Sequence, residues 1–227
     1  MTWNSDRELL TLMRTKLNSC VVGDVLDVLG HRNQFLPPAI RPLQDHLILA
    51  GRAMTVLEAD CCGTTLGHNG EEHAFGRMFE ALDSLKEDEV YICTGSSPEY
   101  AQWGELMSQR ARRLKAAGAV MNGYSRDTRA VREMDYPVFS FGPYGQDQGV
   151  RGRVVDYRCP IRFPNGVVVN PGDLLMGDVD GVVVVPQQIE REVIEAALEK
   201  VSGENRVRDA ILKGMSTVEA FETFGIM

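Results

Sequence analysis

The chain has 227 residues, of which 44% are hydrophobic and 25% are charged, and its formal net charge is -8 at pH 7. This length and composition favour one globular domain whose core is large enough to need no disulfide or structural metal. The negative charge argues against a broad nucleic-acid-binding surface, and no apolar run is long enough to predict a membrane-spanning helix.

The cysteine pattern predicts reduced thiols and a cytoplasmic location. The five cysteines are an odd number, they form no CxxC pair, and the chain does not open on a hydrophobic signal segment. We expect all five to act as small buried hydrophobic residues.

Two amphipathic helices are predicted at the start of the chain, over 5–17 and 19–30, with Gly30 ending the second. A Pro-rich loop follows. Residues 47–59 then predict two strands separated by a turn at Gly51.

The segment 60–73 is polar and rich in glycine. Its two histidines, His68 and His73, lie in no HExxH pattern and near no thiolate pair, so we predict solvent-exposed loop histidines rather than metal ligands. Residues 74–85 predict another amphipathic helix, and 89–95 a strand.

The most informative stretch runs from Trp103 to Asp127. It predicts a helix from Gly104 to Gly118 with an apolar stripe that includes Leu106, and then a short strand and an Asn-Gly turn. The helix's arginines are predicted to be solvated. Ser125, Arg126 and Asp127 follow the turn, where that strand ends.

This arrangement suggests a site for a small carboxylate. A helix start offers free backbone N–H groups and a partial positive charge. The guanidinium of Arg126 offers two parallel N–H donors to an anion, and Asp127 offers a hard oxygen ligand to a divalent cation. Brought together, these parts would hold a carboxylate substrate against a metal ion.

The second half of the chain predicts a strand at 136–142, nearly continuous β-structure over 153–186 and helices over 187–224. Asn-Gly at 165–166 is a strong hairpin signal. Asp178 and Asp180 lie in a stretch that resembles a calcium loop, but the distant glutamate is missing, so a β-turn is predicted. The whole pattern indicates one α/β domain, 1–227, with a mixed sheet and helical termini that can reach a neighbouring molecule.

Several of these motifs resemble the RraA-like proteins, and in the same order along the chain. They are GDVLDVLG, IRPL, AGRAMTV, WGELMSQRARRLKAAG with NGYSRD, NPGDLLMGDVDGVVVVP and the tail FETFGIM. The family includes class II 4-hydroxy-4-methyl-2-oxoglutarate aldolases, which also decarboxylate oxaloacetate, and regulators of ribonuclease E. The resemblance implies a swivelling α/β/β sandwich that forms a homotrimer or a pair of trimers, with sites between subunits.

The resemblance also implies roles for particular residues. Arg126 would hold the keto and carboxylate oxygens of a 2-oxo acid, and Asp127 would bind Mg²⁺ or Mn²⁺. Two acidic residues would complete the site, Asp24 on the early helix and Glu204 on the C-terminal helix of the next subunit, with Glu199 as the competitor of Glu204. Asp24 can also be a helix-start carboxylate with no further role. The pyruvyl carboxylate would lie on the backbone of Gly104, Glu105, Leu106 and Met107.

The predicted activity is therefore metal-dependent cleavage of a C–C bond of a 2-oxo acid through a pyruvate enolate, as an aldolase or an oxaloacetate decarboxylase. Ala130 stands where many of the aldolases carry an acidic residue. Asp127, by contrast, is the residue that the ribonuclease regulators lack, which favours an enzyme. The alternatives are a non-catalytic, protein-binding regulator and another lyase or hydratase acting on a 2-oxo acid.

Overall fold

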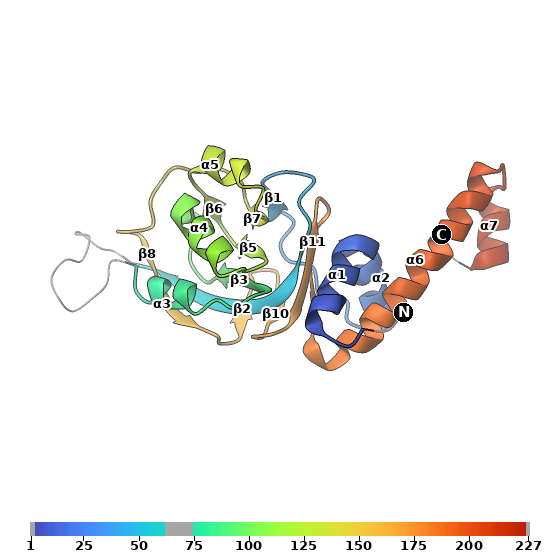
Figure 1. Cartoon of the computed structure of the whole chain (residues 1–227), viewed down its shortest axis with the longest axis horizontal. Helices are drawn as coiled ribbons and strands as arrows, with labels where there is room; N and C mark the ends of the chain where they lie inside the picture. Colours follow the sequence, from blue (N-terminus) through green and yellow to red (C-terminus); the bar gives the residue numbers. More distant parts are fainter. Residues whose placement is uncertain (1–2, 62–74, 226–227) are drawn as a thin grey trace.

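The computed structural model describes residues 3–61 and 75–225. His68, His73 and Cys62 lie outside the described residues. Figure 1 shows a curled sheet with helices on two sides and a helical arm that projects from one end. No helix within the described residues combines the length and apolarity needed to cross a membrane.

The sheet is mixed, as predicted, with its parallel strands in the middle. Its strands run in the order β1-β7-β5-β3-β2-β11-β12, and β8 pairs with β2 beside β11. β2, β3, β5 and β7 are parallel, and the other pairings are antiparallel. The sheet curls so that β1 at one end approaches β11 and β12 at the other. The bounds are Arg41–Pro42 (β1), Leu49–Asp60 (β2), Glu89–Thr94 (β3), Gly118–Met121 (β5), Val138–Ser140 (β7), Gly152–Tyr157 (β8), Leu174–Asp178 (β11) and Gly181–Val185 (β12).

The predicted turn at Gly51 is wrong, because β2 runs without a break from Leu49 to Asp60. Gly51 serves close packing instead: a Cβ there would lie 2.6 Å from the Asp88 carbonyl oxygen. Along β2, Ala53 faces the core inside the curl, and Met54 faces the helices outside. This alternation of a strand's side chains sorts the core into an inner and an outer layer.

The two hairpins predicted in the second half are confirmed. β9 (Ile161–Arg162) pairs with β10 (Val168–Val169) across the Asn-Gly turn, and β11 pairs with β12 across the turn that holds Asp178 and Asp180. Asp178 accepts hydrogen bonds from the backbone N–H (2.7 Å) and hydroxyl (2.6 Å) of Ser19. Its carboxylate therefore anchors the start of a helix, a structural role in keeping with the predicted turn.

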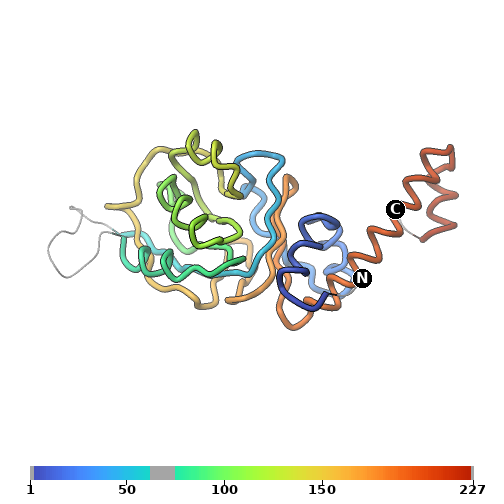
Figure 2. Tube along the Cα trace, viewed as in Figure 1, coloured from blue at the N-terminus to red at the C-terminus, as the bar shows by residue number. Residues whose placement is uncertain are grey.

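Three helices pack outside β11 and β12, and three shorter helices cover the parallel strands (Figure 1). The first group holds the predicted terminal helices, α1 (Asp6–Lys16), α2 (Ser19–Val28) and α6 (Glu190–Leu212). The second group holds α3 (Met78–Asp83), α4 (Glu105–Arg113) and α5 (Thr128–Glu133). A 3₁₀ turn (Gln187–Ile189) precedes α6, and α7 (Thr217–Phe224) folds back on its end to form the arm (Figure 2).

The prediction that every cysteine is buried is wrong for three of the four described ones. Cys93 is buried, but Cys20 is exposed and Cys61 and Cys159 are half-buried. All four are free thiols, as the odd count and the missing CxxC pair predicted. Cys20 is exposed because it lies in the first turn of α2, on the side that faces Asp180 rather than the core.

Candidate active site

The candidate site begins where a short strand turns into a helix. β4 (Ala101–Trp103) pairs in parallel with β6 (Tyr124–Ser125) and leads directly into α4. Gly104 is the N-cap residue of α4 and has extended backbone angles. The first turn of a helix has no internal acceptors for its N–H groups, so those of Leu106 and Met107 are available to a ligand.

Arg126 and Asp127 lie against this helix start, as predicted. The backbone N–H of Arg126 donates to the Trp103 carbonyl at 2.9 Å. Asp127 has φ 56 at the start of α5, and its Oδ2 accepts from the Glu105 N–H at 3.2 Å. The same Oδ2 is 3.6 Å from Arg126 Nε. The guanidinium, the carboxylate and the start of α4 therefore share one surface.

Gly104 makes this close approach possible. A Cβ at this position would lie 2.7 Å from Asp127 Oδ2 and 3.4 Å from Arg126 Cγ. A side chain would therefore fill the space between the helix start and the charged pair. Because Gly104 has no side chain, a small cradle stays open between the helix start and the charged pair.

Asp147 is a residue of the candidate site that no sequence pattern predicted. Its Oδ1 accepts from Arg126 Nη1 at 2.5 Å, and its Oδ2 accepts from the Gly149 N–H at 3.0 Å. It lies in the Gly-rich loop after β7, which has no periodic pattern to single out one acid. The side chains of Arg126, Asp127 and Asp147 are 39%, 45% and 44% exposed, so the site is open to small molecules.

The donors at this site fit a hard divalent cation that keeps several of its own waters. Asp127 Oδ1 makes no hydrogen bond to any described residue. The described part of the chain holds no group of three or more His, Cys, Asp or Glu side chains that could bind a metal. Mg²⁺ is commonly bound by one or two carboxylates together with water and substrate, whereas structural Zn²⁺ requires four protein ligands. One carboxylate beside an open cradle therefore suits Mg²⁺ better than structural Zn²⁺.

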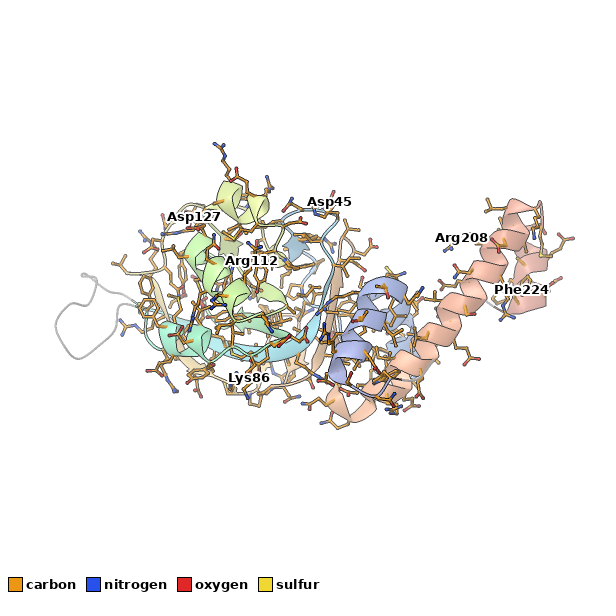
Figure 3. The ribbon with its side chains drawn as sticks, viewed as in Figure 1. Asp45, Lys86, Arg112, Asp127, Arg208 and Phe224 are labelled. Atoms are coloured by element: carbon orange, nitrogen blue, oxygen red, sulfur yellow. The ribbon has the colours of Figure 1, made fainter. Side chains whose placement is uncertain are left out.

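Asp24 and Glu204 lie elsewhere in the chain. Asp24 is on α2 and Glu204 on α6, and Lys200 lies between them, with its Nζ 2.6 Å from Asp24 and 3.9 Å from Glu204. α2 and α6 are on the opposite side of β11 from α4, and Figure 3 shows Asp127 well away from them. Within one chain, Asp24 and Glu204 therefore lie on either side of Lys200, apart from Arg126 and Asp127.

Two details of the predicted helix at 104–118 are wrong. The helix ends at Arg113, because Lys115 takes a left-handed backbone with φ 61 and Gly118 already belongs to β5. Leu106 is 78% exposed rather than part of the buried stripe. The arginines of α4 are exposed, as predicted.

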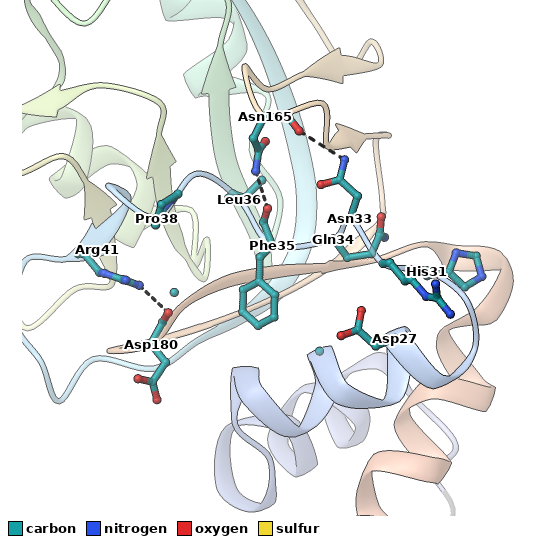
Figure 4. A pocket seen from close by; sticks show the side chains of 13 residues that line it. Asp27, His31, Asn33, Gln34, Phe35, Leu36, Pro38, Arg41, Asn165 and Asp180 are labelled. Carbon is teal, nitrogen blue, oxygen red and sulfur yellow. Dashed lines mark hydrogen bonds between the residues drawn. The ribbon is translucent and has the colours of Figure 1, made fainter.

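A separate pocket of about 420 Å³ lies between α2 and the segment that precedes β1 (Figure 4). Phe35 forms one wall, and its ring packs so closely on α2 that a Cβ at Gly23 would be 2.3 Å from it. Arg41 donates to the Asp180 carbonyl at its edge. None of the predicted site residues lines this pocket.

The sequence profile of the RraA-like family (Aldolase/RraA) matches residues 19–184. The chain belongs to the RraA-like family. The match includes α4, Arg126 and Asp127, so the candidate site lies within the matched region.

Individual RraA-like proteins support this assignment. A protein of Halalkalibacterium halodurans named "Putative 4-hydroxy-4-methyl-2-oxoglutarate aldolase" is 29% identical over 94% of this chain and 93% of its own length. Protein DlpA of Legionella pneumophila is also 29% identical, over 91% of this chain, which spans only 32% of that protein. The structure of Streptomyces coelicolor RraAS2, described as an unusual member of the RNase ES inhibitor RraA protein family, superposes with a TM-score of 0.75 at 24% identity. It covers 90% of this chain and 98% of its own. The fold is therefore the RraA fold.

Proposed function

We propose that this protein is a divalent-metal-dependent lyase that cleaves a C–C bond of a 2-oxo acid through a pyruvate enolate. The reaction would be 4-hydroxy-4-methyl-2-oxoglutarate-type aldol cleavage, oxaloacetate decarboxylation, or both. The observation that carries the proposal is the cradle at Gly104, where the start of α4, Arg126 and Asp127 meet within hydrogen-bonding and ion-pairing distances. The aldolase name of the Halalkalibacterium relative supports the same reaction class.

In this proposal, the N–H groups at the start of α4 hold the substrate carboxylate, which the helix dipole favours there. Arg126 binds the keto oxygen, where negative charge collects when the C–C bond breaks. Asp147 holds the guanidinium in place for that contact. Asp127 would hold Mg²⁺ or Mn²⁺, and either ion, when bound, supplies Lewis-acid stabilisation of the enolate.

The two reactions differ in their need for a base. In decarboxylation the electron pair of the breaking C–C bond moves onto the keto oxygen as CO₂ leaves, so no base is required. Aldol cleavage also needs a group to accept the proton of the 4-hydroxyl. We propose Asp24 and Glu204 of a neighbouring copy for that task, in a homotrimer or hexamer whose terminal helices pack across the subunit interface.

Purified protein is expected to release pyruvate from oxaloacetate when Mg²⁺ or Mn²⁺ is added, and to stop when a chelator is added. A coupled lactate dehydrogenase assay measures the product, and a no-enzyme control corrects for metal-catalysed decay. Restoring excess metal should restore the rate. An absence of turnover with oxaloacetate and with a panel of 4-hydroxy-2-oxo acids would contradict the proposal and favour a protein-binding regulator.

Gly104→Ala is expected to lower kcat/KM by about 10- to 100-fold, since displacing a reacting group by about 1 Å costs on the order of 100-fold. The new Cβ would lie against Asp127 Oδ2 and occupy the cradle. Gly145→Ala is the matched control, because a Cβ there meets nothing within 4 Å. Equal kinetics for the two variants would show that the cradle takes no part in the reaction.

A further inference from the structure

A buried polar cluster lies behind the candidate site. It is centred on Glu58, which is 2% exposed and sits where a bulge shifts the register of β2 against β8. Bulges often re-aim a side chain beside a functional site. Ser96 Oγ donates to Glu58 Oε2 at 3.2 Å, and Gln102 Nε2 donates to Ser96 Oγ at 2.6 Å.

Two atoms of this cluster are unsatisfied. Within residues 3–61 and 75–225, neither Glu58 Oε1 nor Gln148 Nε2 has a hydrogen-bond partner, although both are buried. The Gln148 side chain approaches the Glu58 carboxyl together with those of Gln102 and Cys93. An unpaired acceptor and an unpaired donor in one buried cluster are costly unless one of them takes up a proton or a new partner.

Burial raises the pKa of Glu58 to about 7, and the hydrogen bond from Ser96, with the nearby Cys93, Gln102 and Gln148 side chains, opposes the shift. The titratable groups that face it are the Cys93 thiol, the Tyr91 and Tyr100 hydroxyls and, two residues along β2, the Asp60 carboxylate. None of these four can carry a positive charge. β8 places Val154 opposite Glu58, with Arg153 beside it.

The two residues that hold Arg126, Trp103 and Asp147, are each next in the chain to a glutamine of this cluster. Gln102 precedes Trp103, whose carbonyl accepts the Arg126 N–H. Gln148 follows Asp147, whose carboxylate accepts from the Arg126 guanidinium. A movement of either glutamine is therefore passed to Arg126 through one peptide unit.

We propose that Glu58 is a positioning residue for Arg126, acting through Gln102 and Gln148 on the two segments that hold the guanidinium. The inference rests on the proposed function only in that Arg126 binds the substrate. With Glu58 protonated, the cluster holds the arrangement described above. Once ionised, Glu58 attracts the unpaired Gln148 Nε2 and draws the Asp147 loop inward, so substrate binding weakens as the pH rises through 7.

The same titration acts on stability with a defined sign. The folded chain holds a proton on Glu58 up to about pH 7, whereas the unfolded chain releases it near the ordinary glutamate pKa of 4.5. The contribution of Glu58 to the free energy of unfolding is therefore greatest below pH 4.5. It falls as the pH rises from 4.5 to about 7 and stays constant above that. Glu58→Gln keeps the shape of the protonated form and should remove this dependence.

The direct test follows the Arg126 Nε–H signal by ¹⁵N NMR from about pH 6 to about pH 8.5, a range that spans the expected titration. The signal is assigned with Arg126→Lys. It should titrate with a midpoint near 7 in the wild type and stay constant in Glu58→Gln. Asp173→Asn is the control, because Asp173 is also buried with a raised pKa but lies in the turn before β11. That variant should leave the Arg126 titration unchanged.

Kinetics give a second readout. Over the same pH range, the ratio of the wild-type KM for oxaloacetate to the KM of Glu58→Gln should rise by about tenfold, which corresponds to a pKa difference of one unit. The ratio of the two kcat values should change little. An Arg126 signal that titrates identically in Glu58→Gln, or that does not titrate in the wild type, would overturn the proposal. Because the NMR measurement needs no turnover, a failure of the lyase assignment would be seen separately.

Discussion

Asp127→Asn is expected to reduce kcat/KM for oxaloacetate by about 10³-fold, because a bound divalent ion contributes several kcal/mol to stabilising the enolate. The substitution removes the negative charge that would hold the cation, together with the ion pair between Asp127 and Arg126 Nε. Asn is among the few residues that tolerate the left-handed backbone of Asp127, and its side-chain oxygen can still accept from the Glu105 N–H. The folded structure should therefore survive, with an unchanged melting temperature.

Asp135→Asn is the matched control for this variant. Asp135 also has a left-handed backbone, with φ 52, but its carboxylate pairs with His46 away from the site. Steady-state kinetics and a calorimetric titration with Mn²⁺ should separate the two variants, with metal affinity lost only in Asp127→Asn. Full turnover and unchanged Mn²⁺ affinity in Asp127→Asn would show that the cation is held elsewhere.

Arg126→Lys is expected to reduce kcat/KM by about 10²- to 10³-fold, the usual effect of removing one donor to a developing oxyanion. Lysine keeps the charge but lacks the planar fork. Arg126 uses that fork in two directions, with Nη1 on Asp147 and Nε near Asp127. A single ammonium group cannot hold Asp147 and present a second fixed donor to the keto oxygen.

Arg129→Lys tests whether any arginine on this surface would give the same effect. Arg129 is 94% exposed and pairs only with Glu133, one turn along α5, among the described residues. Its replacement should leave kcat and KM unchanged. Pyruvate binding can be measured as the inhibition constant of added pyruvate, a product of the reaction. It should weaken only in Arg126→Lys. A loss shared by both variants would point to a general electrostatic effect.

Local sequence patterns predicted the elements that frame the site. The cap at Gly104, the strand before Asn122 and the hairpins at 164–166 and 178–181 each depend on a few neighbouring residues. These elements bring Arg126 and Asp127 against the start of α4. The turn predicted at Gly51 is wrong, since a glycine needed for tight packing looks the same in sequence as a glycine in a turn.

The parts that could not be predicted depend on contacts between distant segments. Asp147 meets Arg126 only because β4 and the loop after β7 are brought together at Ala101. Glu58 looks like the polar residue of an ordinary half-buried strand, and its burial follows from the loops that close over it. The separation of Asp24 from Asp127 reflects the curl of the sheet, which no local pattern encodes.

The left-handed backbone at position 127 has an evolutionary consequence. The residues that adopt this conformation most readily besides aspartate are asparagine and glycine, and each is one nucleotide change away from it. A lineage could therefore give up the carboxylate, and with it the catalysis proposed for it, at little cost in folding. The fold can then be retained under selection for binding alone, which would let enzymes and inhibitors arise from one scaffold by very short mutational paths.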